Sequence, residues 1–88
     1  MLKIIFTEHY ARAYKKLDEH LKQEVKAAVE LFKNPAHHRR LRLHKLHGSM
    51  KHYHSFSVNY NVRIVVRIIK NRAVAILIDV GDHSLYEY

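Results

Sequence analysis

Three consecutive runs rich in β-branched residues dominate the C-terminal half of this 88-residue chain. They cover residues 53–58, 62–69 and 73–80, and the tripeptides at 59–61 and 70–72 separate them. Such short separators are typical of β-hairpins, because parallel neighbours need a crossover of a dozen or more residues. The pattern therefore predicts an antiparallel three-stranded meander.

The N-terminal part predicts one more strand followed by two helices. Residues 2–6 are β-branched and aromatic, which indicates a short strand. Apolar residues then recur at spacings of three and four, which is typical of amphipathic helices. Thr7 and Asp18 are suitable N-caps for helices over about 8–17 and 19–33. The expected fold class is α+β, with both helices on one face of a four-stranded, largely antiparallel sheet.

Length and composition narrow the class of protein. Residues 1–88 are expected to form a single domain, and 48% of them are hydrophobic, enough for one core. No cysteine is present, which excludes disulfides and thiolate zinc sites. No apolar window reaches the length of a membrane span, and the N-terminus does not resemble a signal peptide. We therefore expect a cytoplasmic protein that does not contact membranes.

The charge balance indicates a polyanionic partner. Sixteen Lys and Arg face eight Asp and Glu, and nine histidines add to the basic character. Residues 37–54, here called the basic segment, contain no acid, and Leu41, Leu43 and Leu46 are its clear core anchors. This clustering favours nucleic acid first and an acidic protein second. The expected RNA-binding residues are Arg39, Arg40, Arg42, Lys45, His47, Lys51, His52, Tyr53 and Arg67.

The period-two pattern of the meander places two arginines on one sheet face. Arg63 and Arg67 are four residues apart in one strand, so their side chains point the same way. With three-residue hairpin loops, Arg63 lies opposite Ser57 on one side and Asp79 on the other. That face is expected to be open and basic. The helix-covered face is expected to carry Phe56, Val58, Ile64, Val66, Ile76 and Ile78.

The last strand runs into a tail that carries Gly81, His83 and Tyr86. Gly81 permits a turn, His83 exchanges a proton near neutral pH, and Tyr86 can stack or donate a hydrogen bond. The alternative interpretation is structural, with His83 capping the turn and Arg63 only paired to Asp79.

Cleavage of RNA needs a base for the 2′-hydroxyl, an acid for the 5′-oxygen and a cation for the transition state. Histidines such as His44 and His83 are candidates for the proton transfers, and Arg63 is a candidate for the cation. A metal site made of histidine alone would lack partnering Asp, Glu or Cys at the usual spacing. We therefore expect no metal and no other cofactor.

The order of elements and four local motifs resemble the RelE/ParE superfamily, the toxins of bacterial type II toxin–antitoxin pairs. Residues 43–51 resemble the family's L-x-K-L-x-G entry to its second strand. Residues 53–58 and 62–66 resemble its next two strands, and 80–86 resemble its I-G-x-H-x-x-V-Y ending. The resemblance covers essentially the whole chain.

The Gly-x-His ending is similar to the RNase branch of the family, especially its YafQ-like members. The resemblance implies a metal-independent endoribonuclease that cleaves mRNA on the ribosome. It matches His44 and His83 to proton-transferring histidines, Arg63 to the phosphate-stabilising cation and Tyr86 to a terminal aromatic residue that positions the nucleotide. The alternatives are a ParE-like gyrase inhibitor and an inactive basic module that only binds antitoxin.

The resemblance also implies partners and contains three departures, of which one is that Tyr86 stands one residue closer to His83 than in the family pattern. The partners are a cognate acidic antitoxin, mRNA and the ribosome with its 16S rRNA. Where the YafQ-like branch has a further histidine and an aspartate, this chain has Ser57 and Asn61.

Overall fold

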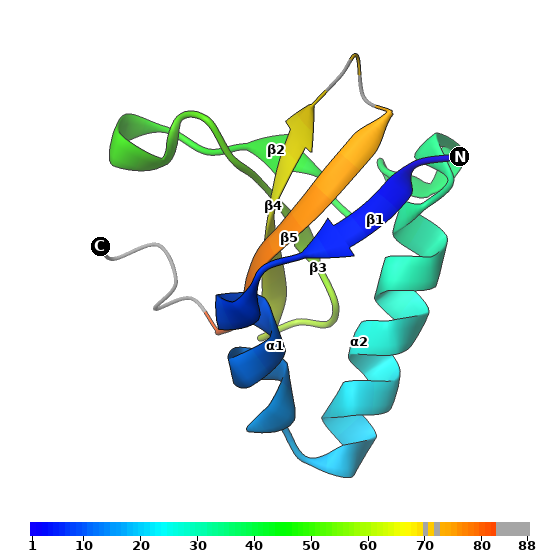
Figure 1. Ribbon diagram of the computed structural model, residues 1–88. Helices are drawn as coiled ribbons and strands as arrows, with labels where there is room; N and C mark the ends of the chain where they lie inside the picture. The colour runs from blue at the N-terminus through cyan, green and yellow to red at the C-terminus, as the bar shows by residue number, and fades with distance from the viewer. Residues whose placement is uncertain (70, 72, 83–88) are drawn as a thin grey trace.

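A five-stranded mixed sheet is the frame of the molecule in the computed structural model, which describes residues 1–69, 71 and 73–82. Figure 1 shows the strands in the spatial order β1-β5-β4-β3-β2. β1 runs parallel to β5, and every other neighbouring pair is antiparallel. The strands are β1 (Lys3–Phe6), β2 (His44–Lys45), β3 (His54–Ser57), β4 (Arg63–Ile69) and β5 (Val74–Gly81). The expected α+β class is confirmed, with the two-residue edge strand β2 added to the four strands predicted.

Two capped helices follow β1. α1 (Glu8–Lys15) begins after Thr7, whose Oγ1 accepts a hydrogen bond from the Tyr10 amide at 3.0 Å. α2 (Glu19–Phe32) begins after Asp18, whose carboxylate accepts from the Leu21 amide at 2.8 Å. Both predicted caps are confirmed, because capping is decided within a few residues of sequence. Among the described residues, neither helix has the length and apolar character that a membrane crossing requires.

Two short 3₁₀ helices interrupt the chain between α2 and β3. The first, η1 (Pro35–His37), is capped by the Asn34 side chain, and the second, η2 (Gly48–Met50), lies in the basic segment. Gly48 adopts a φ of 65°, a left-handed conformation that favours glycine.

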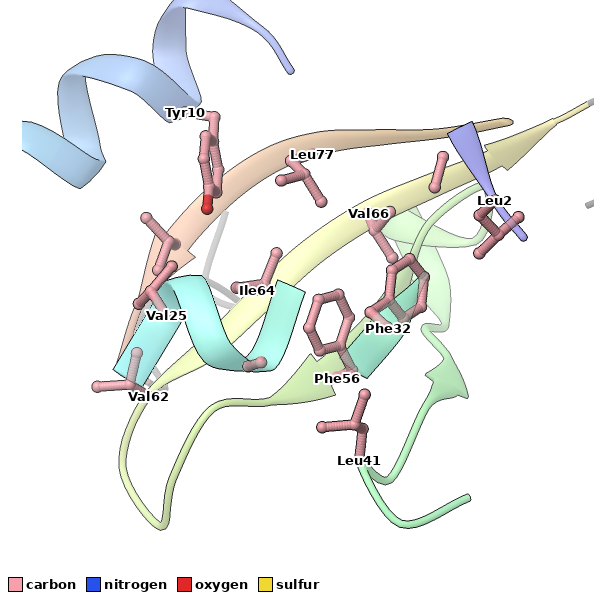
Figure 2. Close-up of a cluster of buried hydrophobic side chains, with 13 residues drawn as sticks. Leu2, Tyr10, Val25, Phe32, Leu41, Phe56, Val62, Ile64, Val66 and Leu77 are labelled. Atoms are coloured by element: carbon pink, nitrogen blue, oxygen red, sulfur yellow. The ribbon is translucent and has the colours of Figure 1, made fainter. Parts of the chain in front are cut away.

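The core lies between α2 and one face of the sheet. Phe32 of α2 stacks on Phe56 of β3, with ring centroids 4.2 Å apart and planes 7° apart. Figure 2 shows these two rings beside Ile64 and Val66 of β4, and all four side chains are fully buried. Leu41 of the basic segment is buried in the same cluster, as predicted.

The register of the last hairpin differs from the prediction. Ile69 pairs with Val74, which leaves four residues between the paired positions instead of three. A slip of one residue exchanges the two faces of a strand. The core side of β5 is therefore formed by buried residues that alternate with the predicted Ile76 and Ile78. They are Ala75 and Leu77, and beyond the irregularity at Ile78 the buried core residue is Val80.

A β-bulge in β5 then returns Asp79 to the face opposite the helices. Val66 pairs with Leu77 but Val65 pairs with Asp79, so Ile78 is the extra residue. A bulge of this kind re-aims the side chains that follow it. Asp79 thus lies on the predicted face but opposite Val65. Arg63 lies opposite Gly81, and β5 extends through this glycine, where a turn was expected.

Candidate functional site

The sheet face opposite α2, here called the distal face, carries Arg63 at the first position of β4, the middle strand. Ser57 pairs with Arg63 as predicted, and Arg63 Nη1 donates a hydrogen bond to Ser57 Oγ at 2.7 Å. On the other side Arg63 pairs with Gly81, which has no side chain to cover it. Arg63 is half-buried. The arginine is thus held in place by a serine of the neighbouring strand β3.

A second row of paired residues crosses the distal face beside Arg63. His44 of β2 pairs with Ser55, Ser55 pairs with Val65, and Val65 pairs with Asp79. Because directly paired residues share a face, His44 lies on the same face as Arg63. His44 Nδ1 is 2.9 Å from the Arg42 carbonyl oxygen. A carbonyl only accepts, so Nδ1 donates and Nε2 holds the lone pair of the neutral, exposed ring.

The basic segment folds over part of this face. Ser55 and Val65 are fully buried although they lie opposite the helical side. Figure 1 shows η2 and α2 on opposite sides of the sheet. The expectation of an open face is therefore wrong for its central row, because the sequence pattern does not reveal a loop packed across it. A cavity of about 530 Å³ remains, lined by His9, Ser49, Met50, Tyr53, Val65, Ile78 and Asp79.

A histidine–aspartate pair at this cavity is absent from the sequence prediction. His9 Nε2 lies 3.0 Å from Asp79 Oδ2, and the side chains are 62% and 9% exposed. The other oxygen of Asp79 accepts from the Val80 amide at 2.9 Å. His9 stands in the first turn of α1, far in sequence from the basic segment. The only signal that brings it to Asp79 is the parallel pairing of β1 with β5, which hairpin patterns do not predict.

The basic segment presents its charges to solvent. No acid lies between Glu30 and Asp79 in the sequence. Tyr53 is half-buried at the cavity. The exposed members of the predicted RNA-binding set are Arg39, Arg40, Arg42, Lys45, His47, Lys51, His52 and Arg67.

Two histidines of the basic segment have structural surroundings. His38 is buried, its ring stacks on Phe32 at 4.6 Å, and its Nε2 lies 2.8 Å from the Phe32 carbonyl oxygen. His54 pairs with Val66, whose side chain faces the core, and is half-buried. Both residues therefore contribute to packing on the helical side.

Two predicted residues, His83 and Tyr86, lie outside the described residues. Within the ranges 1–69, 71 and 73–82, no group of three or more His, Asp or Glu side chains is arranged to hold a metal ion.

Comparison with known proteins identifies the fold. No family model and no curated protein matches the sequence. Among solved structures, YafQ from E. coli superposes with a TM-score of 0.78 over 97% of each chain, at 13% identity. The archaeal RelE–RelB complex from Pyrococcus horikoshii gives 0.72 at 8% identity, over 92% of this chain and 93% of that chain.

The E. coli DinJ–YafQ toxin–antitoxin complex gives a TM-score of 0.71 at 19% identity, over 96% of this chain and 94% of that chain. Each of these similarities covers nearly the full length of both compared chains. The chain has the fold of the RelE-like toxins, which confirms the resemblance at the level of fold.

Proposed function

We propose that this protein is the toxin of a type II toxin–antitoxin pair and a metal-independent endoribonuclease that cleaves mRNA on the ribosome. The observation that carries the proposal is Arg63, held by Ser57 on the distal face of a RelE-like fold. A fixed guanidinium is suited to the charge that develops on a phosphate in the transition state. The surrounding acid-free surface is suited to mRNA and 16S rRNA.

The proposed chemistry begins with attack of the 2′-hydroxyl on the adjacent phosphorus. Arg63 stabilises the added charge, and Tyr53, at the cavity wall, stacks on a base. His44 offers Nε2 to a proton, because the Arg42 carbonyl fixes its tautomer. His83 and Tyr86 complete the proposal, His83 as the second proton carrier and Tyr86 as a contact to the nucleotide.

The proposed protein partner is an acidic antitoxin, encountered in the cytoplasm. A groove of about 670 Å³ between β1 and the two helices is mostly apolar. Phe6 at this groove is 63% exposed. The charged residues that line it are Lys15, Lys26, Lys33 and Glu30, and Glu30 pairs with Lys33. An amphipathic segment with acidic residues on its polar side fits this combination. RelE and YafQ were both solved in complex with partner proteins, RelB and DinJ.

The test compares Arg63→Ala with Arg12→Ala, an exposed arginine on α1. Each variant is expressed from a tightly repressed promoter after induction, and cleavage of a reporter mRNA is mapped by primer extension. We expect Arg63→Ala to slow cleavage by about 10²–10³-fold, the usual effect of losing one transition-state donor. Arg12→Ala should cleave as wild type does.

Two outcomes would contradict the proposal. Equal cleavage by both variants would remove Arg63 from the chemistry. Growth arrest with intact mRNA and induced DNA-damage signalling would favour a gyrase inhibitor instead.

A further inference from the structure

Hydrogen bonds connect three features of the molecule: the bulge in β5, the cap of α1 and the His9–Asp79 pair. Thr7 Oγ1 accepts from the Tyr10 amide and lies 3.4 and 3.3 Å from the carbonyl oxygens of Leu77 and Ile78. The residue that starts α1 is therefore also bound to the bulged residue of β5. This double contact fixes the first turn of α1, and with it His9, against Asp79.

The geometry of the pair fixes which nitrogen of His9 can take a proton. A carboxylate only accepts hydrogen bonds, so Nε2 of His9 carries the proton that lies between it and Asp79 Oδ2. The lone pair of the neutral ring is then on Nδ1. Asp79 is itself held by the Val80 amide and by its buried position. A buried carboxylate behind an exposed imidazole is the arrangement that orients a base and stabilises its protonated form.

Asp79 connects His9 to the region of Arg63, the phosphate-stabilising arginine of the proposed site. Asp79 is two residues from Gly81, the partner of Arg63, so Asp79 and Arg63 are diagonal neighbours on one face. Diagonal neighbours in a sheet are about 7–8 Å apart, a distance that long side chains span. The cavity that His9, Asp79 and Tyr53 line also reaches Val65, which is two residues from Arg63 on the same face.

We propose that His9 is the general base of RNA cleavage and that Asp79 is its positioning residue, an inference that rests on the proposed function. Nδ1 of His9 takes the proton of the 2′-hydroxyl while the 2′-oxygen bonds to phosphorus. The bond from phosphorus to the 5′-oxygen breaks, and that oxygen takes a proton from an acid, for which protonated His44 is the candidate. The products are a 2′,3′-cyclic phosphate and a 5′-hydroxyl, and Asp79 stabilises the imidazolium of His9.

Several titratable and charged groups surround His9. Among the described residues, Asp79 and Tyr53 face the same cavity, and Glu8 and Arg12 of its own helix pair with each other at 3.7 Å. Only the neutral imidazole of His9 can act as the base, so the cleavage rate should rise with pH.

The first experiment measures single-turnover cleavage of ribosome-bound mRNA between pH 5 and pH 9. His9→Gln keeps a side-chain donor toward Asp79 but cannot take a proton. The matched control is His20→Gln, because His20 also pairs with a carboxylate, Glu24 at 3.1 Å, on the exposed surface of α2. We expect His9→Gln to lose about 10²–10⁴-fold in rate and the acidic limb of the pH profile, with unchanged RNA affinity. His20→Gln should match wild type.

Two further measurements separate chemistry from folding. Added imidazole should restore cleavage to His9→Ala, since the exposed position leaves room for the free base, whereas a purely structural role gives no rescue. Asp79→Asn should reduce the rate and alter the acidic limb without abolishing RNA binding. If wild-type protein and His9→Gln both cleave mRNA at the same rate and with the same pH profile, only the assignment of His9 as the base is overturned. Wild-type protein that cleaves no mRNA overturns the proposed function together with it.

Discussion

The two faces of the sheet are held together by different kinds of contact. On the helical face, Phe32, Phe56 and Ile64 exclude water completely and carry no polar atoms in their side chains. On the distal face, polar side chains hold one another: Arg63 with Ser57, and Asp79 with His9. Stability comes chiefly from the first face, because apolar burial is the dominant favourable term in folding. The second face is organised by directional contacts, which fix positions more than they stabilise.

The distribution of charge repeats this contrast. Glu8, Glu19, Glu24 and Glu30 all belong to the helices, whereas the basic segment has no acid. A polyanion therefore meets favourable charge on the basic segment and mixed charge on the helices. Substitutions on the helical face should change the free energy of unfolding, and substitutions on the distal face should change cleavage.

The largest expected effect is on the helical face. Phe56→Ala removes a fully buried ring from its stack on Phe32 and should lower the free energy of unfolding by about 3–5 kcal/mol. Tyr60→Ala is the control, since Tyr60 is 90% exposed and its loss should change little. Urea unfolding followed by circular dichroism measures both. A loss below about 1 kcal/mol for Phe56→Ala would contradict the assignment of this stack to the core.

An intermediate effect is expected where the two faces meet, at Thr7. Thr7→Val keeps the shape of the side chain but removes the hydroxyl that caps α1 and contacts the bulge. The free energy of unfolding should fall by about 1–2 kcal/mol. Asp18→Ala, which removes only the exposed cap of α2, should cost about 1 kcal/mol.

The two cap variants should differ in cleavage of mRNA, measured on the same protein preparations. Thr7→Val should reduce cleavage because the bulge and His9 lose their common anchor. Asp18→Ala should leave cleavage unchanged. Equal cleavage by Thr7→Val and wild type would show that the bulge keeps its form without this hydroxyl.

The smallest effect on the free energy of unfolding at neutral pH is expected for Tyr10, a buried residue of α1. Burial, with a smaller contribution from Tyr14, raises the pKa of Tyr10 from 10.0 to about 12. The unfolded chain therefore loses this proton first as pH rises, so the contribution to stability is complete below pH 10 and disappears as pH approaches 12. Tyr10→Phe should lack this part of the decrease in the free energy of unfolding at alkaline pH, and Tyr60→Phe should retain it. Urea unfolding at pH 7, 10 and 11 distinguishes the variants.

Local sequence was sufficient for much of the fold. The hairpin between β3 and β4 has the predicted register because Asn59 Oδ1 accepts from the amides of Asn61 and Val62, at 2.8 and 2.9 Å. The helix caps are equally local. These contacts lie within three residues of sequence, and the identity of the side chain decides them.

The register of β5 and the His9–Asp79 pair depend on longer contacts. Residues 73–78 are all apolar, so the pattern gives no phase that assigns Leu77 or Ile78 to the core. The bulge adds a residue that no alternation predicts. His9 joins the candidate site only through the pairing of β1 with β5. Arg63 was found from the alternation of its strand, and His44 from the basic segment and the family resemblance.

The pairing of the first strand with the last has a consequence in time. The contact between Thr7 and Leu77 spans 70 residues of sequence, so β1 cannot pair with β5 until nearly the whole domain has been synthesised. At a synthesis rate of about 5–20 residues per second, several seconds separate the two strands. The centre around His9, Asp79 and Arg63 is therefore assembled late. The His9–Asp79 contact therefore forms only after β5 has been synthesised.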